Sequence, residues 1–106
     1  MNNTELRELS LQLLDNILNR VIQLSSNPKN SEKELKERLI FLIEDLDILI
    51  KSVNILDKDF ELREINYIFQ SMLESMENED YYSLKDMLKY ELIPLLEHWK
   101  GVFNNE

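Results

Sequence analysis

Residues 35–56 carry the pattern that most limits how this chain can fold. Apolar side chains recur there at steps that alternate between four and three residues, at positions 35, 39, 42, 46, 49, 53 and 56. This heptad spacing is typical of a helix that packs one continuous apolar stripe against other helices. The sequence therefore predicts a helix over about residues 32–54 at the centre of a helical bundle.

Three further segments have helical periodicity, at about residues 4–24, 58–76 and 81–100. In the first of them, one face carries Leu6, Leu9, Leu13, Ile17, Val21 and Leu24. Its apolar stripe is widened to more than half of the circumference by Leu11, Leu14, Leu18 and Ile22, which suggests contact with two neighbouring helices. Short polar links between the segments force neighbouring helices to run antiparallel, and a chain of 106 residues supports one core. We expect an all-α fold, an up-down-up-down four-helix bundle that forms a single domain over residues 1–106.

Capping residues indicate where the first two helices begin. Either Asn2 or Thr4 can cap the first helix. Asn2 with Glu5, and Ser31 with Glu34, have the spacing of a capping box, in which each residue satisfies a backbone N–H group of the other. The box at Ser31 stands directly before the heptad pattern and predicts the start of the second helix there.

The boundaries of the third and fourth helices are less sharply marked. Asp57 or Asp59 is expected to cap the third helix. Pro94 lies within the fourth pattern, where it removes a backbone donor and clashes with the carbonyl of Tyr90, so we predict one helix kinked at Pro94. Gly101 is placed to end that helix in the left-handed conformation.

The charge of the chain excludes several classes of partner. The net charge is −9, and most of the acidic excess follows residue 56. Such a field repels nucleic acid and anionic membrane surfaces. The chain has no cysteine, no apolar run of the roughly 18 residues that a membrane span needs, and no signal-peptide layout at its start. We expect a cytoplasmic protein that binds neither nucleic acid nor membrane.

Three apolar residues of the second helix do not fit its core stripe. Phe41, Ile48 and Ile55 recur every seven residues on roughly the opposite side, among Glu44 and other polar residues. One hypothesis is a second apolar seam that binds a partner helix or a second copy of the chain. The alternative is that they are scattered surface residues, or are covered by the tails.

The fourth helix has a weaker group of off-core residues beside Pro94. Tyr82, Tyr90 and Ile93 lie away from its main stripe, and tyrosine is common at interfaces. We therefore include them as candidate partner-binding residues. The alternative interpretation places them at the edge of the core.

The sequence lacks the combinations of residues that metal sites and the common catalytic motifs need. His98 is the single histidine, so neither a di-iron bundle nor a usual zinc site can be assembled. The acidic run Asp57 to Glu61 lacks the glycine and the final glutamate of a calcium loop. No phosphate-binding glycine loop or nucleophile motif occurs. We expect no enzymatic activity, no cofactor and no metal.

The last quarter of the chain resembles a known family. Residues 78–81, Leu84, residues 86–88 and the run Tyr-Glu-Leu-Ile-Pro-Leu-Leu at 90–96, up to Trp99, look like the C-terminal helix of an uncharacterised bacterial family of small four-helix proteins. That family implies no established activity. In size, acidity and helix count the chain is also similar to flagellar export chaperones of the FliT and FlgN kind, which implies a chaperone-like role.

Together these patterns predict a non-enzymatic helical module that binds a protein partner through a helix, as a chaperone or adaptor does. The alternative is a structural homo-oligomer that associates through Phe41, Ile48 and Ile55. The sequence leaves open the partner, the oligomeric state, and whether the first helix packs on its own chain or on a neighbour.

Overall fold

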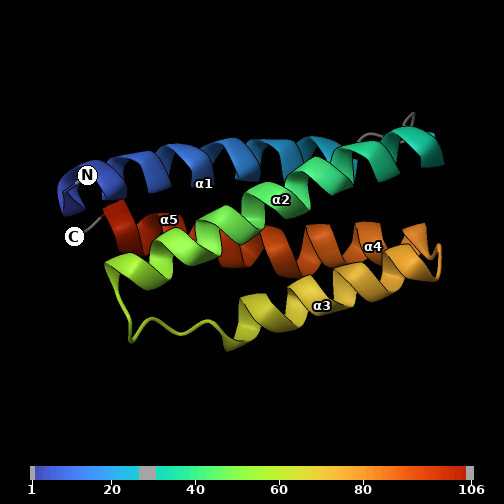
Figure 1. Cartoon of the computed structure of the whole chain (residues 1–106). Coiled ribbons are helices and arrows are strands. Elements are labelled where there is room, and N and C mark those ends of the chain that lie inside the picture. The colour runs from blue at the N-terminus through green and yellow to red at the C-terminus, as the bar shows by residue number, and fades with distance from the viewer. Residues whose placement is uncertain (1, 27–30, 105–106) are drawn as a thin grey trace.

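The computed structural model describes residues 2–26 and 31–104, and its regular elements there are all helical (Figure 1). They are α1 (Asn3–Ser26), α2 (Glu32–Leu56), α3 (Arg63–Glu77), α4 (Tyr81–Met87), the π-helical segment η1 (Leu88–Leu92) and α5 (Ile93–Asn104). Because α4, η1 and α5 follow one another without a break, the described residues form four helical rods and no strand. The predicted all-α class is confirmed.

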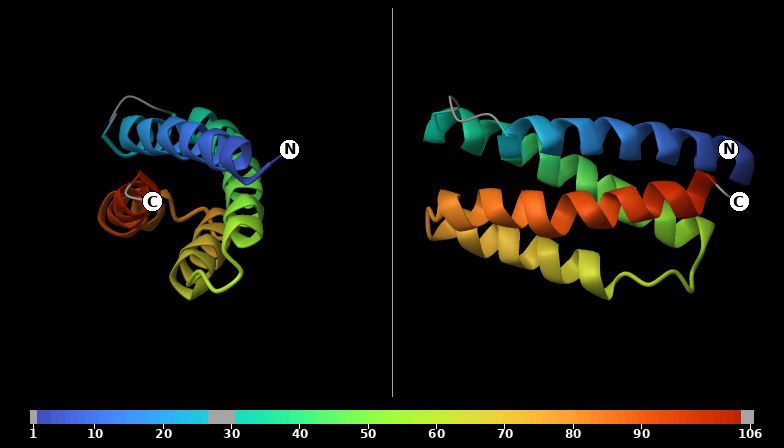
Figure 2. Two further views of the ribbon diagram at one scale, coloured as in Figure 1. Left: turned by 90° about the vertical axis from the view of Figure 1, so that its left-hand side faces the viewer. Right: turned by 180° about the vertical axis from the view of Figure 1, so that it is seen from behind.

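Successive rods run in opposite directions along an elongated molecule of 41 × 23 × 22 Å. The two ends of the chain consequently lie at the same end of the bundle (Figures 1 and 2). This is the up-down-up-down arrangement that the short links predict. The helix α1 packs on its own chain, between α2 and α5.

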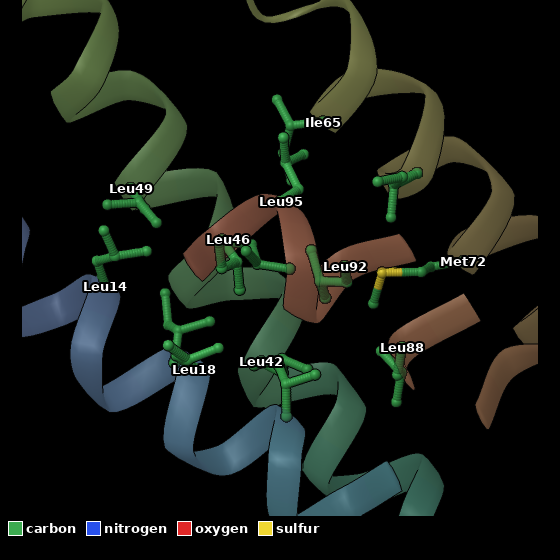
Figure 3. Close-up of a cluster of buried hydrophobic side chains, with 14 of the residues drawn as sticks. Leu14, Leu18, Leu42, Leu46, Leu49, Ile65, Met72, Leu88, Leu92 and Leu95 are labelled. Atoms are coloured by element: carbon green, nitrogen blue, oxygen red, sulfur yellow. The ribbon is translucent and has the colours of Figure 1, made fainter. Parts of the chain in front are cut away.

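The heptad stripe of α2 forms one wall of the core. Its buried members are Leu35, Leu39, Leu42, Leu46, Leu49 and Val53, while Leu56 at the helix end is half-buried. Figure 3 shows Leu42, Leu46 and Leu49 facing side chains from the other rods. The sequence pattern thus identifies the inner face of α2 correctly.

The buried stripe of α1 is rotated from the predicted one. Leu14 and Leu18 are buried together with Ile17, Val21 and Leu24, whereas Leu9 is exposed. Leu9 lies about 140° from Leu14 around an ideal helix, outside the sector that faces α2 and α5. Apolar residues cover more than half of α1, so periodicity alone did not locate the centre of its buried face.

At both predicted capping boxes the side chain of the first residue accepts the backbone N–H of the glutamate three residues later. The N–H of Glu5 donates to Oδ1 of Asn2 at 2.8 Å, and the N–H of Glu34 donates to Oγ of Ser31 at 3.1 Å. Each bond satisfies a donor that the first turn of a helix leaves unpaired. These side chains therefore set the beginnings of α1 and α2.

The helix α3 begins at Arg63, later than the predicted start at residue 58. Asp57 closes a local turn by accepting the N–H of Asp59 at 3.0 Å and does not cap α3. Phe60 then lies against Trp99 and Phe103, with ring centroids 5.2 and 5.1 Å apart. These aromatic contacts hold residues 57–62 in a non-helical linker at one end of the bundle.

Glu61 lies just before the first turn of α3. Its carboxylate accepts the N–H of Arg63 at 2.7 Å and also binds the Arg63 guanidinium at 3.0 Å. The hydrogen bonds to Arg63 hold the pKa of Glu61 below its usual range and raise that of Arg63. The pair is fully exposed to solvent, so its contribution to stability is small.

The last rod contains a π-helical turn directly before Pro94. Leu84, Leu88, Leu92 and Leu96 are all fully buried at steps of four residues. Three such steps turn a regular α-helix by about 120°, which would carry the last leucine off the core. In η1 the N–H of Ile93 donates to the carbonyl of Leu88, five residues back. A π-helical turn contains more residues than an α-helical turn, so each residue advances less around the helix axis. The four leucines therefore stay on the face that points to the core.

The predicted end at Gly101 is wrong. The helix α5 continues to Asn104, and no glycine has a positive φ among the described residues. Phe103 lies beyond Gly101 and is buried against Phe60. Burial of this ring offsets the roughly 1 kcal/mol that glycine costs inside a helix.

The left-handed cap occurs instead at the end of α3. Glu79 has φ of 56°, the N–H of Asp80 donates to the carbonyl of Ser75 at 2.8 Å, and the N–H of Glu79 donates to that of Met76 at 3.1 Å. This is a Schellman motif built on glutamate where glycine is usual. Asp80 then caps α4 by accepting the N–H of Ser83 at 3.1 Å. Hydrogen bonding by the side chain and then the backbone of Ser83 lowers the pKa of Asp80.

Candidate functional site

The side of α2 that faces away from the core carries exposed apolar side chains. Phe41, Ile48 and Ile55 are 63%, 52% and 65% exposed, as their position opposite the core stripe predicts. We call these three residues the outer seam. Seen along the bundle, α2 lies at its edge, and no described helix covers its outer side (Figure 2, left).

Charged residues border the outer seam. Glu37 and Glu44 are exposed on α2 beside it, and Lys51 forms an ion pair with Asp47 at 2.9 Å on the same surface. A row of apolar side chains with a charged rim is the composition of many protein interfaces. The seam is narrow, because its apolar residues are spaced one full heptad apart.

The candidate residues of the fourth rod do not form one surface. Tyr82 and Tyr90 are 81% and 66% exposed, but Ile93 is half-buried and packs against the core. Tyr82 lines a shallow hollow with Leu35 of α2, whereas Tyr90 lines another with His98. The structure therefore separates the two tyrosines and places Ile93 at the edge of the core.

A pocket between α1 and α2 adjoins the outer seam. Its volume is about 340 Å³, close to the lower limit of small-molecule sites. Its lining comes from one stretch of each helix and comprises Arg20, Gln23, Leu24, Arg38, Phe41 and Leu42. Phe41 belongs to both features, so the outer seam leads directly to the mouth of this pocket.

The two arginines of the pocket are held differently. Nη2 of Arg20 donates to Oδ2 of Asp45 at 2.5 Å, an ion pair that joins α1 to α2. Arg38 is exposed, and within the described chain no ion pair engages it. The pocket thus combines an apolar floor with a positively charged rim that retains one available guanidinium.

Sequence reasoning identified Phe41 but missed Arg20, Gln23 and Arg38. The spacing of Arg38 and Phe41, three residues apart on one helix, was the available signal, since such residues are neighbours on a helix surface. The contribution of α1 could not be found in this way. It depends on which turn of α1 lies against which turn of α2.

A metal-binding cluster and a membrane-spanning helix are two features that the described residues lack. Among them, no group of three or more His, Asp, Glu or Cys side chains is placed to hold a metal ion. His98 is exposed beside Glu64 and Tyr90 in its shallow hollow. No helix in the described ranges is both long and apolar enough to cross a membrane.

The described residues form an all-α bundle with an apolar core and an exposed apolar row on the outer side of α2. The chain belongs to the family described as a domain of unknown function, DUF8042, whose model matches residues 5–102. The match covers most of the chain, whereas the resemblance in the sequence was confined to its last quarter. No curated protein and no solved structure matches the chain.

Proposed function

We propose that this protein is a non-enzymatic helical module that binds a protein partner, as a chaperone or adaptor does, through the outer face of α2. The observation that carries the proposal is the exposure of Phe41, Ile48 and Ile55 in one row. Large apolar side chains aligned on one face of a helix are the usual docking surface for the apolar face of another helix. The resemblance to flagellar export chaperones is consistent with this role and remains a prediction.

The free energy available from the outer seam is modest. Complete burial of a large apolar side chain contributes about 1.5–3 kcal/mol, and the three residues are already about half to one-third buried. Together they contribute on the order of 3–4 kcal/mol. Association costs at least about 4 kcal/mol in lost translation and rotation. A partner must therefore make further contacts beyond the outer seam.

A homo-oligomer that pairs through the same seam is the second candidate. The charge of the chain argues against it, because two copies would each bring a net charge of −9 to the interface. The acidic side chains Glu37 and Glu44 beside the seam would also approach their counterparts in the other copy. A partner that is less acidic, and that places no carboxylates opposite Glu37 and Glu44, avoids both sources of repulsion.

Capture from a lysate of the source cells tests the proposal. The intact protein is immobilised, and bound proteins are identified by mass spectrometry. The test variant is Phe41→Ser with Ile48→Ser. The matched control is Tyr67→Ser with Leu73→Ser on α3, since Tyr67 is as exposed as Phe41 at 66%.

We expect a protein that is captured by the wild type and the control but not by the test variant. Capture of the same proteins by all three would refute the proposal. Sedimentation of the purified proteins separates the two candidates, because the homo-oligomer predicts a dimer that dissociates only in the test variant.

A further inference from the structure

The pocket between α1 and α2 lies where a helix docked on the outer seam must pass. Phe41 is a member of the outer seam and also part of the pocket wall. A helix in contact with Phe41 therefore presents neighbouring side chains to the mouth of the pocket. The further contacts that the outer seam requires are available there.

The pocket differs in charge from the rest of the molecule. The chain carries 21 acidic and 12 basic residues, yet the described residues that line the pocket include two arginines and no carboxylate. Asp45 neutralises Arg20 from outside the lining. Arg38 remains available, so an apolar group bordered by a negative charge is the complementary ligand.

Leu24 and Leu42 lie beneath the pocket, and Phe41 supplies most of its accessible apolar surface. Both leucines are buried by packing and form the inner wall of the pocket, while the longer Arg38 and Gln23 side chains are exposed at its rim. The pocket has a volume of about 340 Å³ and is partly open to solvent, and we expect one apolar side chain of a partner to occupy it. The rim can then bind polar groups of the same ligand.

We infer that this pocket anchors an amphipathic helix of the partner, whose apolar side chain enters between α1 and α2 while a single carboxylate one turn away pairs with Arg38. The inference rests on the proposed function and adds the chemistry of the partner. Residues three or four apart lie side by side on a helix, which matches the placement of Leu42 and Arg38 four residues apart. Arginine pairs with a carboxylate through two parallel hydrogen bonds, which fixes the register of the partner.

A displayed library of amphipathic helical peptides tests the inference. The residues beside the apolar face are randomised to Glu, Lys, Gln or Ser, and the library is selected against the intact protein. We expect enrichment of Glu three or four residues from an apolar anchor. Enrichment of Lys, or of no charge, would overturn the inference.

Variants of the protein then locate the contact on the enriched peptide. We expect Arg38→Gln to weaken binding about tenfold, with an equal loss when the peptide Glu is replaced by Gln and little further loss when both changes are combined. Arg63→Gln, the same change at an exposed arginine on α3, should leave the dissociation constant unchanged. Circular dichroism verifies that each variant is folded.

The outcomes distinguish the inference from the proposed function. If Phe41→Ser abolishes binding and Arg38→Gln does not change it, the outer seam binds a partner but the pocket is not its anchor. If the selection enriches no peptide, the inference and the proposal of a partner helix both fail. A dimer of the purified protein that dissociates on Arg38→Gln would show that a second copy occupies the pocket, and would overturn the inference.

Discussion

Replacement of Leu46 by alanine is expected to destabilise the bundle by about 3–4 kcal/mol. Leu46 is fully buried at the middle of α2 and faces side chains from the other rods (Figure 3). The substitution removes three carbon atoms, whose transfer from water contributes about 2.4 kcal/mol at about 0.8 kcal/mol each. The remaining loss comes from the cavity, because neighbouring leucines collapse into it only in part.

The control for this prediction is Ile48→Ala on the same helix. Ile48 belongs to the outer seam and is 52% exposed, so its truncation removes about half as much buried apolar surface and should lower the free energy of unfolding by about 1 kcal/mol. Urea denaturation measures both variants, with the fluorescence of the single buried tryptophan, Trp99, as the probe. Equal losses at the two positions would refute the assignment of inner and outer faces to α2.

Three further predictions concern helix ends and the linker. Glu79→Gly should raise the free energy of unfolding by about 0.5–1 kcal/mol in urea titrations, because glycine adopts a positive φ at no steric cost. The lowered pKa of Asp80 means that its cap stabilises the protein above the unfolded pKa of about 3.9 and is lost as the pH falls through the lower folded value. The unfolding free energy should therefore drop more steeply with acid in the wild type than in Asp80→Ala. Phe60→Leu should lower thermal stability by about 1 kcal/mol through loss of the edge-on contact with Trp99, as calorimetry would show.

The inner face of α2 could be predicted from the sequence because one physical constraint acts there. Apolar side chains at steps of three and four residues can be buried together in a helix and in no other regular structure. The capping side chains Asn2 and Ser31 were predictable for a similar reason, since the hydrogen bonds they make are local. Local chemistry therefore determined most of the fold.

The helix boundaries near Phe60 and Gly101 could not be predicted locally. Phe60 contacts Phe103 across a long separation in sequence, and that contact favours both the non-helical linker 57–62 and the extension of α5 past Gly101. Local capping preferences place aspartate at the start of a helix and glycine at its end. At both positions burial of an aromatic ring outweighed the local preference.

The candidate site was predictable only for the residues that α2 supplies alone. Phe41, Ile48 and Ile55 share one helix, so their common face follows from its geometry. The pocket requires Arg20 of α1 to stand opposite Arg38 of α2, which depends on the axial alignment of two helices. Side-chain packing along the whole length of α1 and α2 sets that alignment.

The small buried surface of α3 has a consequence for how the molecule opens. Its buried residues are Ile65, Ile68 and Met72, and the non-helical linker 57–62 joins it to α2. The ion pairs Arg20–Asp45 and Lys100–Asp15, by contrast, fasten α1 to its two neighbours. Backbone amides of α3 should therefore exchange their hydrogens with deuterium earlier than those of α1, through a partial opening that leaves the other rods assembled.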